Sequence, residues 1–155
     1  MSPSPATKHR SPRSAFWDTS AVVPLCCHQT QTGPAVRLAR QHPRQVAWWT
    51  TAVEATSAFN RLHRERALTA AGITQALARL DYLRRRWHEV LPTDDVRGRA
   101  ERLPGTHALR AADALQLAAA LVWCSDRPRG RHLVASDGRL ADAARAEGFT
   151  LVRIG

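Results

Sequence analysis

Four acidic side chains each follow a short apolar run, and they are the residues of this chain best suited to chemistry. They are Asp18, Glu54, Asp113 and Asp137. Carboxylates can hold a hard divalent cation, because oxygen is the ligand atom that such ions prefer. They can also cap helices, because a side-chain oxygen accepts hydrogen bonds from the free N–H groups of a first helical turn. Each of the four has to be weighed against both uses.

Taken one at a time, the four acids favour the capping interpretation. Thr51 and Glu54 have the spacing of a capping box, in which each side chain accepts from the other residue's backbone N–H. Asp18 and Asp137 each precede a helical segment, which is the place of an N-cap. Asp113 falls in the first turn of its helix, where the helix dipole stabilises a negative charge by roughly 0.3–1 kcal/mol.

The apolar pattern predicts the strands and helices that position these acids. Strands are predicted over residues 15–17, 46–49, 88–91, 132–135 and 150–154, and helices over residues 19–25, 34–41, 52–66, 74–86, 94–103, 110–123 and 139–147. In the helix over residues 74–86, we expect Leu77, Leu80 and Leu83 to be buried. Strands and helices that alternate along the chain predict an α/β domain around a parallel sheet.

Taken together, the four acids favour a metal site. Ligands of an open parallel sheet bind beyond the carboxyl ends of its strands, where the strand order reverses. Asp18, Glu54 and Asp137 follow the first, second and fourth predicted strands, so they converge if the first strand lies between the other two. Asp113 can reach the same point. Carboxylates gathered this closely repel one another, and Mg²⁺ or Mn²⁺ removes that repulsion.

Other common sites leave no signature in the sequence. The glycine patterns of nucleotide-binding loops, G-x-x-x-x-G-K-[ST] and G-x-G-x-x-G, do not occur, and neither does the G-x-S-x-G turn of serine hydrolases. The cysteines and histidines lack the C-x-x-C and H-x-x-x-H spacings of zinc sites. These absences disfavour nucleotide-dependent, serine-hydrolase and zinc chemistry.

Several segments resemble a known family, the PIN domains, and most closely the VapC-like toxins of bacterial toxin–antitoxin pairs. The segments are Asp-Thr-Ser-Ala at 18–21, Glu54 at a helix start, the run 110–118, and the run 136–144 with Glu-Gly-Phe at 147–149. The run 110–118, Arg-Ala-Ala-Asp-Ala-Leu-Gln-Leu-Ala, is the most specific of them. The resemblance extends over residues 16–154, which is nearly all of the chain expected to fold.

The resemblance implies a fold, an activity and partners. The fold is a three-layer α/β/α domain with a five-stranded parallel sheet in the order 3-2-1-4-5. The activity is Mg²⁺-dependent cleavage of RNA by an endoribonuclease, and the partners are a cognate antitoxin and a second copy of the chain in a homodimer. A non-catalytic PIN-like module that binds nucleic acid or protein is the alternative.

The resemblance also assigns roles to the acids. It implies that Asp18, Glu54, Asp113 and Asp137 form a catalytic quartet, in which Asp18, Asp113 and Asp137 hold the metal. Thr19 or Ser20 would support Asp18.

The basic charge of the chain predicts affinity for phosphate backbones. Lysine and arginine number 23 against 13 acidic residues, a net charge of +10, and Lys8 is the only lysine. Arginine-rich helix faces can also be simply solvated. The arginines that we expect to hold RNA are Arg61, Arg64, Arg84, Arg85 and Arg86.

The chain divides into a short tail and one domain. Residues 1–13 are polar and rich in Pro, Ser and Arg, so we expect a disordered tail before a nuclease domain over residues 14–155. The tail lacks the apolar middle of a secretory signal, and no apolar run approaches the roughly 20 residues that span a bilayer. We therefore expect a cytoplasmic protein that does not enter the membrane.

Overall fold

A five-stranded parallel sheet forms the centre of the computed structural model, which describes residues 13–155. Its strands are β1 (Ser14–Trp17), β2 (Arg44–Trp48), β3 (His88–Val90), β4 (His132–Ala135) and β5 (Thr150–Arg153). They pair in the order β3-β2-β1-β4-β5, so β1 is central. The chain adds β2 and β3 on one side of β1, and β4 and β5 on the other. The predicted strand order is confirmed.

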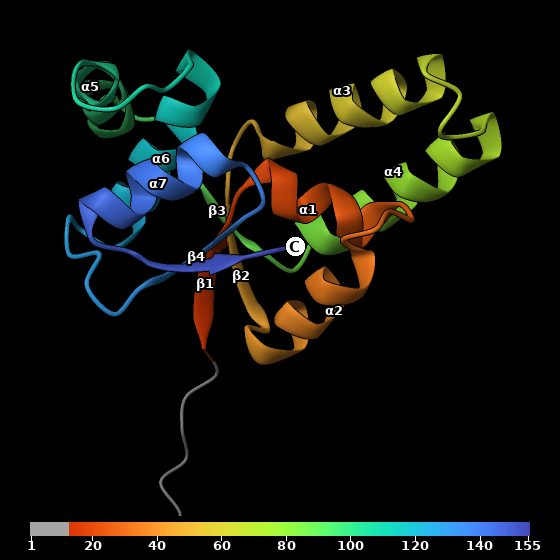
Figure 1. Ribbon diagram of the computed structural model, residues 1–155, viewed down its shortest axis with the longest axis horizontal. Helices are drawn as coiled ribbons and strands as arrows, with labels where there is room; N and C mark the ends of the chain where they lie inside the picture. Colours follow the sequence, from red (N-terminus) through yellow and green to blue (C-terminus); the bar gives the residue numbers. More distant parts are fainter. Residues whose placement is uncertain (1–12) are drawn as a thin grey trace, which may run out of the picture.

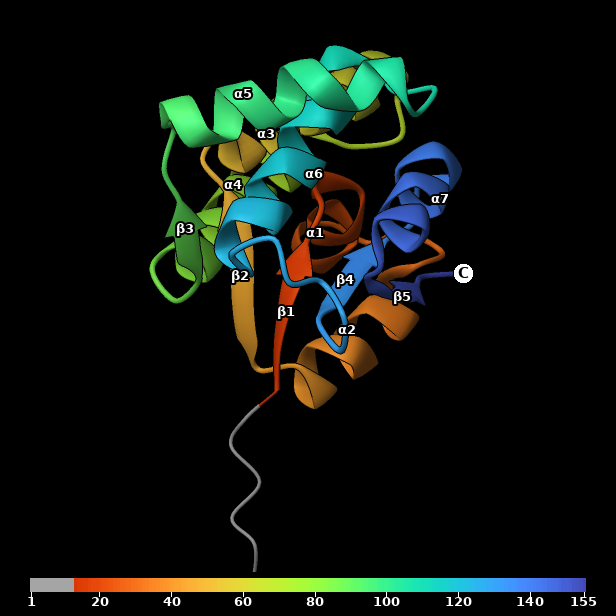
Figure 2. The same ribbon diagram turned by 90° about the vertical axis from the view of Figure 1, so that its left-hand side faces the viewer.

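Helices cover both faces of the sheet, as Figures 1 and 2 show. On one face lie α1 (Thr19–Cys26), α2 (Thr32–Gln41), α3 (Thr51–Arg64) and α4 (Ala70–Arg84). On the other lie α5 (Asp94–Arg102), α6 (Ala111–Trp123) and α7 (Gly138–Glu147), with a short 3-10 turn, η1 (Leu103–Gly105), between α5 and α6. The three-layer α/β/α fold is therefore confirmed.

The central strand shows how the sequence builds two cores. Successive side chains of a strand point to opposite faces, so Ala15 and Trp17 pack under α1 to α4 while Phe16 packs under α5 to α7. All three are fully buried. The part of a strand that is covered on both faces is apolar at every position, which is why residues 15–17 of β1 form a continuous apolar run.

Helix α4 differs from its prediction at its start and on its buried face. The Thr69 side chain accepts a hydrogen bond from the Gly72 N–H and caps the helix, which therefore begins at Ala70, earlier than the predicted residue 74. Leu80 and Leu83 are buried as predicted, but Leu77 is 38% exposed. Ala76, which is fully buried, takes the core position instead, because residues four and three apart share one helix face.

Two predictions concern parts of the chain outside the fold itself. The tail predicted over residues 1–13 lies outside the described residues, apart from Arg13, which directly precedes β1. Between residues 13 and 155, no helix is both long and apolar enough to cross a membrane.

Candidate active site at the carboxyl ends of the strands

Two of the four acids extend from neighbouring strands and cap the helices that follow. Asp18 comes directly after β1 and accepts a hydrogen bond from the Ser20 N–H at 3.1 Å, at the start of α1. Asp137 comes two residues after β4 and accepts from the Leu140 N–H at 3.0 Å, at the start of α7. Because β1 and β4 are parallel neighbours, the two carboxylates lie at the same end of the strands, which we call the carboxyl edge of the sheet. The end at which the strands begin is the amino edge. Both capping predictions are confirmed.

The predicted capping box of Thr51 and Glu54 is wrong. The helix α3 is preceded by Thr50 as its N-cap, and Thr51 is its first residue. The two oxygens of Glu54 accept instead from the hydroxyls of Thr50, at 2.7 Å, and of Thr19, at 2.8 Å. The bond to Thr19 holds the Glu54 carboxylate against the start of α1, on the side of Asp18.

The fourth acid, Asp113, lies in the first turn of α6, as predicted. Three residues later on the same helix, the side chain of Gln116 is buried, with an exposed fraction of 1%. Its Nε2 lies 2.9 Å from Thr19 Oγ1, 3.2 Å from Thr51 Oγ1 and 3.2 Å from Glu54 Oε2. Gln116 therefore connects α6 to α1 and α3 at the acidic edge.

Sequence reasoning missed Gln116 as a site residue. Its signal is present nonetheless: Gln116 is the one polar residue in the apolar run 114–123, and it is one helical turn from Asp113. A lone polar group in a buried helix needs a hydrogen-bond partner, so its position predicts a polar contact.

Ser20 joins the ends of β1 and β4. Its hydroxyl donates to Asp18 Oδ2 at 2.6 Å and accepts from the N–H groups of Ser136, at 3.0 Å, and Asp137, at 3.3 Å. The sequence predicted that Thr19 or Ser20 would support Asp18. The Ser20 side chain contacts Asp18, whereas the Thr19 side chain contacts Glu54.

Two of the four acids, Asp18 and Asp113, have a raised pKa. Asp18 is 5% exposed, and burial, with a smaller effect of the nearby Glu54 charge, raises its pKa to about 6 against the hydrogen bonds from Ser20. Partial burial, followed by the charges of Asp137 and Glu54, raises the pKa of Asp113 as well. The charge of Glu54 therefore acts on both Asp18 and Asp113, and the charge of Asp137 acts on Asp113.

Among the described residues, none of the four acids has an arginine or histidine nitrogen within 4.0 Å, although the more distant charge of Arg110 acts on Asp113. Six other acids of the chain lie within 4.0 Å of an arginine or histidine nitrogen: Asp81, Glu89, Asp94, Asp126, Asp142 and Glu147. The hydrogen bonds of Asp18, Glu54 and Asp137 come from hydroxyl, amide and backbone N–H groups instead.

The acidic edge fits a hard cation that keeps part of its water shell. Within residues 13–155, no three acidic, histidine or cysteine side chains form a ready-made metal centre. Mg²⁺ does not need one, because it is usually held by one or two carboxylates, several waters and the phosphates of a substrate. An all-oxygen donor set whose members repel one another suits such an ion.

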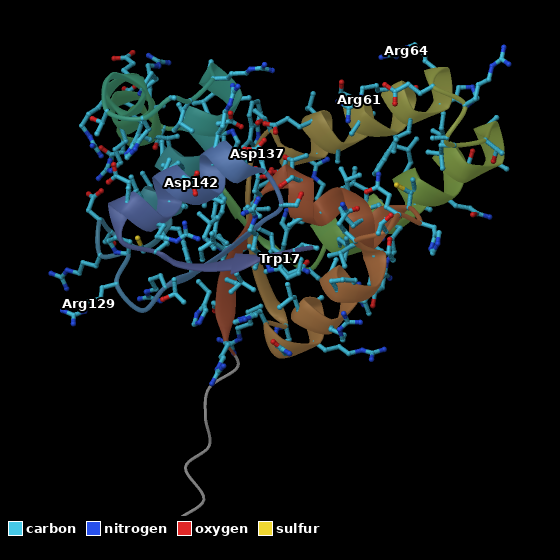
Figure 3. All side chains as sticks on the ribbon, in the orientation of Figure 1. Trp17, Arg61, Arg64, Arg129, Asp137 and Asp142 are labelled. Carbon is cyan, nitrogen blue, oxygen red and sulfur yellow. The ribbon has the colours of Figure 1, made fainter. Side chains whose placement is uncertain are left out.

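A cavity of about 420 Å³ opens beside the acids. Thr19, Ser20, Glu54 and Ser136 line it, and Arg61 contributes from α3. Figure 3 shows Asp137 near the beginnings of α1 and α3, with Arg61 and then Arg64 further along α3. Of the arginines expected to hold RNA, Arg61 thus adjoins the acids, and Arg64 is exposed one turn away.

The run of residues 84–86 lies at the other edge of the sheet, between the end of α4 and the start of β3. Arg84 contacts Glu89 at 3.9 Å and Arg85 contacts Asp81 at 2.8 Å. The guanidinium of Arg86 lies over the Tyr82 ring, 3.8 Å from its centroid. These arginines therefore do not adjoin the acidic cavity.

Solved structures share this architecture, although no protein-family model and no curated protein matches the chain. VapC20 of Mycobacterium tuberculosis, described as a toxin that cleaves the sarcin-ricin loop, superposes with a TM-score of 0.65 at 23% identity, over 90% of this chain and 99% of its own. PAE2754 of Pyrobaculum aerophilum gives a TM-score of 0.59 at 18% identity, over 91% and 89%. A toxin–antitoxin complex of Klebsiella pneumoniae gives 0.55 at 18% identity, over 83% and 91%.

This chain has the fold of a VapC-like PIN domain. The resemblance seen in the sequence is thereby confirmed at the level of the fold. In this PIN-like domain the acids do not depend on one element, since they come from the ends of β1 and β4 and from the first turns of α3 and α6. The folded sheet and its helices are therefore what gathers them.

Proposed function

We propose that this PIN-like protein is an endoribonuclease that requires Mg²⁺ or Mn²⁺. The observation that supports the proposal is the cluster of Asp18, Glu54, Asp113 and Asp137, which in residues 13–155 has no arginine or histidine nitrogen within 4.0 Å although the chain carries a net charge of +10. Gathering like charges raises the free energy of the folded protein, and a cation that binds among them lowers it again. A phosphodiester substrate brings further negative charge to the same place, which a divalent cation also offsets.

Each acid has a role in the proposed reaction. Asp18 and Asp113 would hold the ion directly and Asp137 would hold it directly or through a bound water, and the ion would act as a Lewis acid and offset the charge that develops on the scissile phosphate. Glu54 would orient the attacking water as a hydrogen-bond acceptor, because Thr19, Thr50 and Gln116 fix the direction of its oxygens.

Two side chains around the acids would assist in other ways. Ser20 positions Asp18 through its 2.6 Å hydrogen bond. Arg61, on the wall of the cavity, would bind a phosphate of the RNA backbone next to the scissile bond. The proposed substrate is therefore a single strand that passes along α3 as it enters the cavity.

We further propose that the chain is the toxin of a toxin–antitoxin pair, that a protein antitoxin inhibits it and that it forms a homodimer. Support comes from the fold shared with a toxin–antitoxin complex and with an RNA-loop-cleaving toxin. Co-expression with the product of the adjacent reading frame should yield a stable complex without ribonuclease activity. Light scattering of the protein alone should give twice the mass of the chain. A monomer that ignores the adjacent gene product would contradict this part.

The central test is cleavage of RNA by metal-free protein to which Mg²⁺ or Mn²⁺ is returned. Asp113→Asn should lose the metal-dependent activity. Asp142→Asn is the matched control, because Asp142 is an exposed acid on α7 that contacts Arg145 at 3.2 Å, outside the cluster. Equal activity of the two variants would remove Asp113 from the reaction.

One observation favours the alternative, a non-catalytic module. Asp18 and Asp137 already serve as helix caps, and a cap needs no metal. Wild-type protein that binds RNA, cleaves none with either ion and shows no thermal shift on adding the ions would support that alternative over the nuclease.

A further inference from the structure

A second cavity, of about 420 Å³, lies at the opposite edge of the sheet from the acids. The first residues of three neighbouring strands line it: Ser14 of β1, Arg44 of β2 and His88 of β3. Arg86 and Trp123 complete its polar and aromatic walls. Because the strands are parallel, this cavity marks their amino ends as the acidic cavity marks their carboxyl ends.

The positive charge of this cavity is not offset. None of its lining residues is acidic, and in residues 13–155 neither Arg44 nor Arg86 contacts a carboxylate. The preceding arginines differ, since Arg84 and Arg85 are each within 4.0 Å of a carboxylate. Both Arg44 and Arg86 are exposed, so a dissolved anion can reach them.

The cavity also offers an aromatic surface and continues along the protein. Trp123 is partly exposed, and the guanidinium of Arg131 lies 5.5 Å from its ring centroid. An adjoining cavity of about 450 Å³ shares Arg86 and adds Arg40 and Arg79. Arg129, labelled in Figure 3, lies at this same edge, in the loop that leads into β4.

We propose that this amino-edge groove, formed by Ser14, Arg44, Arg86, His88 and Trp123, binds the backbone of single-stranded RNA. Phosphates would contact Arg44 and Arg86, and one base would stack on Trp123. The inference rests on the proposed function, because RNA is the substrate there. It adds an anchoring site away from the bond that is cleaved.

The charge of this anchoring site would attract RNA before a metal ion binds at the acids. The four carboxylates repel a phosphate backbone until a cation binds, and the one arginine in the lining of the adjoining cavity, Arg61, offsets them only in part, so this is a poor place for first contact with RNA. The amino-edge groove attracts the same backbone at long range and needs no metal. Its volume lies within the roughly 300–1,000 Å³ of ligand pockets, which accommodates a nucleotide.

The lining favours RNA over an acidic protein segment. Protein partners bind through large apolar anchors, whereas most of the side chains that line this cavity carry guanidinium, imidazole, amide or hydroxyl groups, and its apolar part is Pro43, Val46 and the Trp123 ring. Phosphate, sugar and base edges match those groups.

The test measures binding without cleavage. The full chain, in EDTA, is titrated into fluorescently labelled single-stranded RNA of mixed sequence and into oligouridine. The variant Arg44→Ala/Arg86→Ala is compared with Arg85→Ala/Arg145→Ala, which removes the same charge from two exposed arginines that have acidic partners. Thermal melts check that both variants fold.

Loss of two phosphate contacts should reduce the slope of log K against log salt by about 1.4 for the groove variant. Affinity at low salt should fall on the order of tenfold, equally for both RNA sequences. The control should stay close to wild type. Arg44→Lys/Arg86→Lys should keep most of the affinity, because lysine still binds phosphate as a point charge.

Two results with RNA would overturn the proposal: equal RNA affinity of the groove variant and the control, or wild-type RNA affinity of the groove variant. A third would come from titrating a glutamate-rich peptide in the same way. It is a peptide that binds wild type but not the groove variant, while the RNA affinity of the two proteins is the same. The last would assign the groove to an acidic protein. Because binding is read without metal, the groove is also separable from the nuclease. A protein that binds RNA through Arg44 and Arg86 but never cleaves it would support the groove and contradict the proposed function.

Discussion

The carboxyl and amino edges of the sheet carry opposite charges, and the charged side chains have different neighbours at the two edges. At the carboxyl edge, Asp18 and Glu54 accept hydrogen bonds from hydroxyl, amide and backbone groups, and burial raises the pKa of Asp18 to about 6. At the amino edge, Arg44 and Arg86 are exposed to water. Neutral donors hold the carboxylates in place, whereas in residues 13–155 no carboxylate lies within 4.0 Å of Arg44 or Arg86, and Arg86 lies over the Tyr82 ring.

The difference shows how a basic protein keeps a site acidic. In a chain with 23 basic and 13 acidic residues, six of the nine acids outside the cluster lie within 4.0 Å of an arginine or histidine nitrogen. Neutral donors such as Ser20 and Gln116 fix the direction of a carboxylate without neutralising it, so its charge stays available to a cation. Burial strengthens the attraction between an ionised carboxylate and a cation, because less water screens the two charges.

The largest expected effect separates chemistry from binding. Asp18→Asn/Asp113→Asn should reduce cleavage of RNA about 100-fold or more, which corresponds to about 3 kcal/mol of lost transition-state stabilisation. The same variant should bind RNA more tightly than wild type in EDTA, because two repelling charges are gone. Arg44→Ala/Arg86→Ala should do the reverse, with weaker binding and little change in kcat. Single-turnover kinetics and anisotropy check both halves, and a shared loss of kcat and affinity in both variants would contradict the division.

The next effect concerns stability as a function of pH in metal-free protein. The folded pKa of Asp18, about 6, lies above its unfolded value of 3.8. Its stabilising contribution is therefore complete below pH 3.8 and is lost as pH rises through 6, at a cost of about 3 kcal/mol. The asparagine of the Asp18→Asn variant cannot ionise. The free energy of unfolding of the variant relative to wild type should therefore rise as the pH increases from 3.8 through 6. Urea titrations in EDTA from pH 4 to 8 measure the difference, and parallel profiles for the two proteins would contradict the assigned shift.

Metal binding should reverse that cost. At about 100 times its Kd, Mg²⁺ or Mn²⁺ adds roughly 2.7 kcal/mol of stability by mass action, or a rise in Tm of about 5–10 °C. Asp113→Asn should lose most of this shift, whereas the control Asp142→Asn should keep it. Differential scanning calorimetry with and without the ion checks the expectation, and an unchanged Tm in wild type would count against a metal at the acidic edge.

A smaller effect tests the neutral donors. Gln116→Leu should lower the free energy of unfolding by about 1–3 kcal/mol, because it removes the donor shared by Thr19, Thr51 and Glu54. Activity should fall as well, since Glu54 loses part of its support. Chemical denaturation together with cleavage assays measures both changes, and full activity would show that Thr19 and Thr50 hold Glu54 without help.

The smallest effect is expected at an arginine with an acidic partner. Arg85→Ala should change the free energy of unfolding by less than about 0.5 kcal/mol, because exposed pairs one turn apart on a helix contribute little. RNA affinity should also hardly change. A loss as large as that of Arg86→Ala would mean that the amino edge acts through its total charge and not through particular side chains.

The sheet was predictable from the sequence because its three inner strands, β1, β2 and β4, each end in a short run of buried apolar residues. The convergence of the acids required the first strand to lie between the second and the fourth, and the resemblance to PIN domains implied that order, which the structure confirms. Asp18 and Asp137 were also predictable as caps, because a cap and its partner lie within three residues of each other.

The contacts of Glu54 and Gln116 were not predictable in the same way. A local pattern paired Glu54 with Thr51, but the folded chain brings it Thr19, 35 residues away, and Gln116, 62 residues away. Hydrogen bonds over such separations depend on how helices pack on the sheet, and hydrophobic periodicity carries no information about them. The exposure of Leu77 was missed for the same reason. A leucine near the border between the buried and the exposed face of a helix can lie on either face, and only the packing of the helix decides which.

The hydroxyl of Ser20 has a consequence for protein engineering. The hydroxyl donates its one hydrogen bond to Asp18, and its oxygen accepts hydrogen bonds from the backbone N–H groups of Ser136 and Asp137. One atom therefore links the ends of two strands. Transplanting the four acids onto another scaffold would therefore bring their charges but not their directions. A working graft would have to carry Ser20 and Gln116 with them, together with a crossover that sets two parallel strands side by side.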